Sequence, residues 1–230
     1  MANREQAKQQ RRDEIVNAAR TLMQKTGKAG FSMRTLADEA GVSIATPYNL
    51  FGSKQAVMFA VLDADLEQYQ VRLERLRADE VDVFFKAVSL AAEFYATEPN
   101  FYRAVLLSVY NDGGSEFRSM FSGPRHAMWK RLVDNAIAAG ALSRDVDAAA
   151  FAVHLGNVLF SCILEWVHGQ LSLDELEARG QYGFALALSG MSSPDSGERL
   201  RRRVISSQKR MRTLFRQRAR SPGQANGSKR

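Results

Sequence analysis

Residues 33–54 (MRTLADEAGVSIATPYNLFGSK) constrain the fold of this chain more than any other stretch. Leu36, Ala37 and Ala40 recur at spacings of three and four residues, which places them on one face of a helix. Gly41 follows where that helix must end, because glycine adopts the left-handed backbone conformation without steric cost. The segment therefore predicts two short helices joined by a tight turn, the helix-turn-helix arrangement that places one helix in a DNA major groove.

The second helix of this motif has two possible starting points. Ser43 is a candidate N-cap, because a serine hydroxyl can accept a hydrogen bond from a backbone N–H of the first turn. Alternatively, Thr46 is the N-cap and Pro47 the first helical residue, where a missing N–H has the smallest effect. The second alternative gives a shorter helix.

Charge is distributed unevenly along the 230 residues. Residues 1–60 carry nine Lys/Arg and five Asp/Glu, residues 61–190 carry eleven and eighteen, and residues 191–230 carry twelve and two. A basic N-terminal segment favours contacts with phosphates, because the release of counterions drives such binding. The acidic middle segment argues against DNA lying along that part of the chain.

The sequence contains no pattern that is typical of an enzyme or a metal site. Cys162 is the only cysteine, so a disulfide framework and a cysteine metal cluster are excluded. His126, His154 and His168 have no metal-ligand spacing, and neither a glycine-rich phosphate loop nor a nucleophile motif is present. We therefore expect no enzymatic activity, no metal and no cofactor. The polar N-terminus is not a secretory signal, which predicts a cytoplasmic protein.

Helical periodicity predicts an all-α chain without strand alternation. The apolar segment 148–167 is long enough for a membrane span, but His154, Asn157, Ser161 and Glu165 interrupt it, so we expect a helix buried on two sides. Three parts are predicted: a helix-turn-helix domain (1–54), a helical domain (55–193), and a basic amphipathic helix with a disordered tail (194–230). The expected helices cover residues 11–26, the two motif helices, 53–77, 81–96, 100–110, 124–139, a helix that begins at Asp145 or Asp147 and ends at Val167, and 173–188, with a basic helix after Pro194.

The basic helix after Pro194 has more than one interpretation. Leu200, Val204, Met211 and Phe215 form an apolar stripe, which favours packing of this helix on the body of the protein. The basic face is either solvated, an additional DNA contact, or attracted to an anionic surface.

Residues 10 to 60 resemble the DNA-binding domain of the TetR (tetracycline repressor) family of bacterial regulators. Two residues depart from the family pattern: Pro47 replaces a larger aliphatic residue, and Leu50 replaces the frequent His or Tyr. The residues that carry the resemblance are Phe31, Ser32, Leu36, Ala37, Ala40, Gly41, Val42, Ser43, Thr46, Tyr48, Phe51 and Lys54.

The resemblance implies two sets of DNA contacts. Ser32, Tyr48 and Lys54 would contact phosphates. The base edges would be faced by Arg34, Thr35, Ala45, Thr46 and Asn49. Within this second set, Arg34 suits a guanine, Asn49 suits an adenine, and Ala45 suits a thymine methyl group.

The middle of the chain is rich in aromatic residues. At helical spacing such residues usually form a core, but they also line apolar pockets between helices. The resemblance favours a pocket, because the second domain of this family commonly binds small effectors. The candidate pocket residues are Phe84, Phe94, Tyr95, Tyr102, Phe121 and Trp129.

Members of this family usually dimerise through their last two core helices, here 148–167 and 173–188. Small side chains allow helices to approach closely, and the expected dimer contacts are Ala152, Leu155, Gly156 and Leu159.

The interpretation is a TetR-like transcriptional regulator, predicted to be a repressor that binds a palindromic operator as a homodimer and responds to a small apolar effector. Two identical recognition helices would enter successive major grooves of double-stranded DNA. The alternative is a constitutive DNA-binding or DNA-organising dimer without a ligand switch. In that case the aromatic middle is only a core. No membrane partner is expected.

Overall fold

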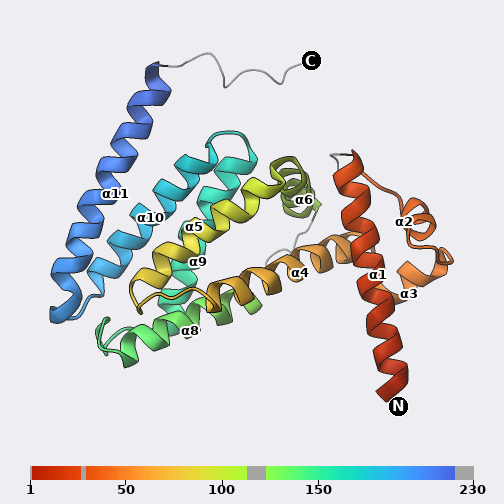
Figure 1. The fold of residues 1–230 in the computed structure, drawn as a ribbon, viewed down its shortest axis with the longest axis horizontal. Coiled ribbons are helices and arrows are strands. Elements are labelled where there is room, and N and C mark those ends of the chain that lie inside the picture. The colour runs from red at the N-terminus through yellow and green to blue at the C-terminus, as the bar shows by residue number, and fades with distance from the viewer. Residues whose placement is uncertain (1, 27–29, 113–122, 221–230) are drawn as a thin grey trace. The chain divides into compact units, whose positions relative to one another are not determined.

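A computed structural model describes residues 2–26, 30–112 and 123–220, and within this part of the chain all regular structure is helical (Figure 1). One isolated β-bridge joins Leu142 to Ser192. The predicted all-α class, with an N-terminal helix-turn-helix, is therefore confirmed. The helices are Ala2–Thr26 (α1), Met33–Glu39 (α2), Ala45–Phe51 (α3), Lys54–Glu74 (α4), Asp82–Thr97 (α5), Pro99–Asp112 (α6), Pro124–Ala138 (α8), Ala148–Val167 (α9), Leu173–Gly190 (α10) and Pro194–Arg220 (α11).

The chain forms two compact units. The first contains residues 1–68 and 98–120, and the second contains residues 69–97 and 121–230. The domain limits expected from the sequence, at residues 54 and 193, stay a prediction. The tail 221–230, which the sequence predicts to be disordered, and the candidate pocket residue Phe121 lie outside the described residues.

The first unit has its core between α1, α2, the start of α4 and α6. Ile15 and Ala19 of α1, Leu36 of α2, and Val57 and Val61 of α4 are fully buried. Burial of such side chains contributes roughly 1.5–3 kcal/mol for each large aliphatic residue. α1 thus forms the support on which the two motif helices pack.

α1 begins nine residues earlier than its apolar periodicity indicates. Residues 4–10 of this addition are exposed and mostly polar, so they carry no hydrophobic signal. Side-chain pairs four residues apart, Gln9 with Asp13 (2.8 Å) and Gln10 with Glu14 (3.2 Å), support this part of the helix.

The second unit is built around α10, which packs against α5, α9 and α11 (Figure 1). Two glycines of α10 make this close packing possible. A Cβ atom on Gly180 would lie 2.8 Å from Val88 Cγ1 of α5, and one on Gly183 would lie 2.5 Å from Val158 Cγ1 of α9. Each position therefore requires the absence of a side chain.

α9 packs against α8 on one side and α10 on the other. Asp147 caps its first turn, accepting hydrogen bonds from the N–H groups of Ala149 (2.9 Å) and Ala150 (3.1 Å). By length and composition α9 could cross a membrane, a criterion that core helices of soluble proteins also meet. Its buried side chains are Phe151, Ala152, Leu155, Leu159, Cys162, Ile163, Trp166 and Val167.

Candidate nucleic-acid interface

The start of α2 is fixed by two hydroxyl groups. Ser32 is its N-cap, and its Oγ accepts a hydrogen bond from the N–H of Thr35 (3.0 Å) and lies 2.8 Å from Thr35 Oγ1. Leu36 and Ala37 of this helix are buried, which leaves the face with Arg34 exposed. The first motif helix therefore presents a polar face to solvent.

A tight turn joins α2 to α3. Gly41 adopts a positive φ of 64°, and the N–H of Val42 bonds to the carbonyl of Ala37 at 2.9 Å. The left-handed conformation at Gly41 agrees with the expectation from the sequence.

α3 starts at Ala45, so neither of the two predicted N-caps was right. Ile44 occupies the N-cap position and makes no side-chain cap hydrogen bond. The Ser43 hydroxyl instead lies 2.9 Å from the Thr46 hydroxyl. Pro47 is the third helical residue and is buried. A proline is tolerated there because the first four N–H groups of a helix have no partner within the helix.

α3 has only seven residues and is held at its end by α1. The Arg12 guanidinium donates a hydrogen bond to the carbonyl of Leu50 and lies over the Phe51 ring, 4.3 Å from its centre. An isolated helix of this length is unstable in water. We therefore regard Arg12 as a positioning residue for α3, which the sequence analysis did not identify.

A second cation, Lys54 at the start of α4, lies over the Phe31 ring at 5.1 Å from its centre. Lys25 of α1 pairs with Glu39 of α2 at 2.8 Å. The first contact links the start of α4 to the residue before α2, and the second links α1 to the end of α2. The Lys54 side chain is half-buried at the edge of the motif.

The eight predicted DNA-contact residues lie on α2, α3 and their borders. Tyr48 is 50% exposed, and only Thr46 and Lys54 are half-buried. Ile44, which the sequence analysis did not include, is 45% exposed directly before α3. An exposed apolar side chain at this point suits a thymine methyl group. The exposed members of the predicted set are Ser32, Arg34, Thr35, Ala45, Tyr48 and Asn49.

The candidate pocket residues do not lie in one unit. Tyr102 belongs to the first unit, where its ring contacts Phe101 with centres 5.0 Å apart, whereas Phe84, Phe94, Tyr95 and Trp129 belong to the second. In the second unit these residues take part in core contacts. Phe84 is fully buried. The other three rings each contact a second aromatic ring, with these distances between ring centres: Phe94 with Tyr69 (6.4 Å), Tyr95 with Trp166 (5.2 Å) and Trp129 with Phe184 (5.2 Å).

The predicted dimer contacts lie on the inner face of α9. Ala152, Leu155 and Leu159 are buried within the protomer, and Gly156 faces the Trp129 ring, whose Cδ1 would lie 3.6 Å from an added Cβ. Ala152, Leu155 and Leu159 are thus covered within the protomer, and the dimer role of the four residues stays a prediction. A Cβ at 3.6 Å from Trp129 would be in ordinary contact with the ring, so the α8–α9 packing does not itself require glycine at position 156. The exposed residues of α9 are Ala150, Val153, His154, Asn157 and Ser161.

Within the described residues, no three His, Cys, Asp or Glu side chains gather in a metal-binding arrangement. A surface hollow of about 420 Å³ lies between the segment before α5 and the end of α8, lined by Ala78, Asp79, Glu80, Val83, Leu132, Asn135, Ala138 and Ala139.

α1, α2 and α3 form a three-helix domain with an exposed polar face on α2 and α3. This arrangement defines the class of helix-turn-helix DNA-binding domains. Residues 15–61 match the sequence profile of the bacterial regulatory proteins of the tetR family. This match identifies residues 15–61 as a DNA-binding domain of the TetR family of bacterial regulators. A comparison with curated proteins gives no match.

Solved structures share this fold over most of their length. FadR of Thermus thermophilus, a TetR-family repressor in complex with lauroyl-CoA, has a TM-score of 0.64 at 22% identity, covering 78% of this chain and 94% of its own. RolR in complex with resorcinol has a TM-score of 0.65 at 15% identity, and the match covers 86% of this chain and 95% of RolR. SmeT, the repressor of a multidrug efflux pump of Stenotrophomonas maltophilia, has a TM-score of 0.58 at 16% identity, covering 80% and 92%. At these identities the likeness is one of fold.

Proposed function

We propose that this regulator is a repressor that binds a palindromic operator as a homodimer in the cytoplasm, and that a small, largely apolar effector weakens this binding. The observation that carries the proposal is the exposed set on α2 and α3, which places a cation, an amide and a phenol on one short motif. Such groups bind base edges and phosphates.

In this proposal Ser32, Tyr48 and Lys54 contact phosphates. The base edges are read by Arg34, Thr35, Ala45, Thr46 and Asn49. A bidentate amide–adenine contact provides about 1–3 kcal/mol of discrimination, whereas each phosphate contact contributes to affinity without regard to sequence.

The first experiment separates these two roles. Binding sites are selected from random DNA with the wild type and with Asn49→Ala, and the operator found is titrated at several salt concentrations with Lys54→Ala. We expect an altered consensus for Asn49→Ala, and for Lys54→Ala a salt slope reduced by roughly one unit. Lys86→Ala, on α5 of the second unit, is the matched control. An unchanged consensus together with an unchanged slope would contradict the assignment.

The proposed dimer face consists of the exposed residues of α9 and the neighbouring edge of α10. Val153 is 47% exposed and Leu186 is 48% exposed. The ion pair between Glu165 and Arg179 and the close contact of Gly183 with Val158 bring these two edges together. Exposed apolar side chains on adjacent helices favour contact with a second copy.

The effector is proposed to bind the second unit next to Tyr95, which is half-buried and stacks on Trp166. The similar structures with lauroyl-CoA and resorcinol support a ligand with apolar or aromatic character. A ligand that prefers the non-binding state a hundredfold shifts the equilibrium by about 2.7 kcal/mol at saturation.

The effector experiment measures thermal stabilisation over a panel that includes acyl-CoA thioesters and phenols, followed by operator titration with each binder. Tyr95→Leu should weaken binding of the hits, and Tyr110→Leu, on α6 of the first unit, is the control. Binders that leave operator affinity unchanged would favour the alternative, a constitutive DNA-binding dimer.

A further inference from the structure

The last helix, α11, carries its cations on two different faces. The helix has a large positive net charge, because ten Lys/Arg and two Asp/Glu lie between residues 194 and 220. The inner face packs on α10, and Leu200 and Ser207 are buried there. The cations at the border of this inner face are used within the protomer.

In the first half of α11, two arginines pair with carboxylates at the start of α5. Arg199 Nη2 lies 2.5 Å from Asp79 and 2.9 Å from Asp82, and Arg203 Nη2 lies 2.6 Å from Asp82. These ion pairs hold α11 in place, and the charges of the two arginines are balanced there.

The second half of α11 is held in the same way on α10. Arg210 donates to Glu177, which also accepts from Ser89 of α5, and Arg218 lies 3.5 Å from Glu175. Burial raises the pKa of Glu177, but the hydrogen bonds from Arg210 and Ser89 outweigh it, so the pKa lies below its ordinary value. Glu177 is therefore a charged partner for α11.

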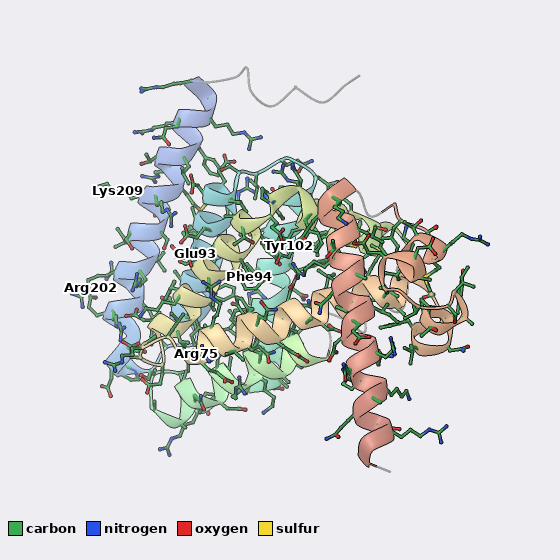
Figure 2. The ribbon with its side chains drawn as sticks, turned by 45° about the vertical axis from the view of Figure 1, so that its right-hand side comes forward. Arg75, Glu93, Phe94, Tyr102, Arg202 and Lys209 are labelled. Carbon is green, nitrogen blue, oxygen red and sulfur yellow. The ribbon has the colours of Figure 1, made fainter. Side chains whose placement is uncertain are left out.

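The outer face of α11 carries a separate set of cations, which we name the outer stripe. At 100° per residue these side chains fall within an arc of about 100°, on the side opposite Leu200 and Ser207, and they extend over about 28 Å of helix. The outer stripe consists of Arg201, Arg202, Lys209, Arg212, Arg216 and Arg220, all exposed. Figure 2 shows Arg202 and Lys209 on the side of α11 that is turned away from the helical bundle.

Few other side chains interrupt this stripe. Among the described residues of the same arc, Glu198 is the carboxylate, and it lies 4.0 Å from Arg202 Nε in an exposed pair. Ile205 is the large apolar residue, 58% exposed. A helix that binds in the plane of a membrane needs a continuous exposed apolar face. On α11, Leu200 is buried and Val204 and Met211 are half-buried, while Phe215, 41% exposed, lies under the Arg179 guanidinium of α10.

We propose that the outer stripe is a second, sequence-independent binding surface for the phosphate backbone of duplex DNA. The argument is charge complementarity: six cations along one line of a rigid helix match a duplex that carries one negative charge per about 1.7 Å of its axis. The choice of DNA as the polyanion rests on the proposed function, in which this protein already binds DNA. The proposal requires only that duplex DNA contacts α11, on the same molecule as the operator or on another.

The experiment compares two fourfold variants of the full chain. The stripe variant carries Arg201→Gln, Lys209→Gln, Arg212→Gln and Arg216→Gln. The control variant carries Arg75→Gln, Lys86→Gln, Lys130→Gln and Arg144→Gln, four exposed residues elsewhere in the second unit. Both lose four positive charges, and glutamine is a good helix former, so the helices should persist. Circular dichroism and thermal melting check that both variants fold.

The measured quantity is the affinity for duplex DNA without an operator, over a range of salt concentrations. We expect the stripe variant to lose affinity and its salt slope to fall by up to about 3–4 units, since each phosphate contact accounts for about 0.9. The control variant should retain most of the wild-type affinity and slope. Equal behaviour of the two variants would overturn the proposal.

Two further experiments distinguish this proposal from binding through the helix-turn-helix motif and from binding to a membrane. The same titrations in a Tyr48→Ala/Lys54→Ala background remove proposed motif contacts, and stripe-dependent binding should remain there even if the operator assignment fails. Phosphatidylcholine vesicles that contain phosphatidylserine test for a lipid partner. Stripe-dependent binding to these vesicles, with none to duplex DNA, would assign α11 to a membrane surface and overturn the proposal.

Discussion

The guanidinium of Arg20 on α1 donates a hydrogen bond to the buried carboxylate of Asp65 on α4. The same guanidinium lies 3.2 Å from Glu98, before α6, and 4.9 Å from the centre of the Phe101 ring. One side chain thus joins three helices of the first unit. Because α1 also packs against α2 and bonds to the end of α3, this contact connects the two motif helices to the rest of that unit.

Replacement of Arg20 by alanine should lower the free energy of unfolding by about 3 kcal/mol, because it leaves the Asp65 carboxylate buried without its cation. The side chains are 24% and 8% exposed, so water can compensate little. Lys25→Ala, which removes a pair whose lysine is 62% exposed, should change stability by less than about 1 kcal/mol. Urea unfolding measures both. Similar losses in the two variants would show that the Arg20 contact is no stronger than a surface pair.

Gly183→Ala should destabilise the protein by roughly 1–3 kcal/mol, because the added methyl group overlaps Val158 and forces α9 and α10 apart. This loss exceeds the gain of up to about 1 kcal/mol that alanine brings to a helix. Gly190→Ala is the matched control on α10, since nothing lies within 4 Å of its added Cβ. Thermal melting should rank Gly183→Ala below the wild type and Gly190→Ala at or above it, and the reverse order would contradict the packing.

Leu186→Arg should weaken the proposed homodimer by tenfold or more, because it introduces a charge into an interface that would otherwise bury an apolar side chain. Val71→Arg is the control, since Val71 is a similarly exposed apolar residue on α4, a helix that is not part of the proposed face. Sedimentation over a concentration series measures the dissociation constant. A monomeric wild type at micromolar concentration would refute the dimer itself.

The contact of α11 with α10 should weaken in acid. A folded-state pKa of Glu177 below its ordinary value of 4.5 means that the ionised carboxylate stabilises the fold above this value, and that the stabilisation is lost as pH falls through the lowered pKa. The wild type should therefore be more stable than Glu177→Gln at neutral pH, and the difference should shrink below about pH 4.5. Urea unfolding from pH 7 downward gives the difference, with Glu93→Gln on α5 as an exposed control. A constant difference over this range would contradict the assignment.

The fold class could be predicted from the sequence because apolar spacing and breaker residues carry most of the helical signal. The first motif helix ends before Gly41, and the helices at Pro99 and Pro124 begin close to where these residues place them. The start of α1 could not be predicted, because its first turns are stabilised by polar side-chain pairs and show no apolar period. The start of α3 was misjudged because two hydroxyls that each could cap a helix bond to one another.

The faces of α9 could not be distinguished from the sequence. Burial inside a protomer and burial against a partner produce the same run of apolar and small residues. Gly156 illustrates this, since it faces Trp129 of α8 within the protomer, although a small residue at this position equally suits contact with a second copy. The aromatic residues of the middle segment pose the same difficulty, because the periodicity of a core and that of a pocket lining are identical. Ile44 was overlooked because a single apolar residue in a turn gives no pattern.

The dependence of α3 on Arg12 has a consequence for how DNA specificity can change. The helix ends on contacts from α1 to Leu50 and Phe51, whereas Ala45, Tyr48 and Asn49 lie on its exposed side. The residues that shape the helix and those proposed to read DNA are therefore separate. We therefore expect that Ala45, Tyr48 and Asn49 can be substituted without loss of the helix. An α3 grafted onto a related domain should require an arginine at the position of Arg12 in the first helix of that domain.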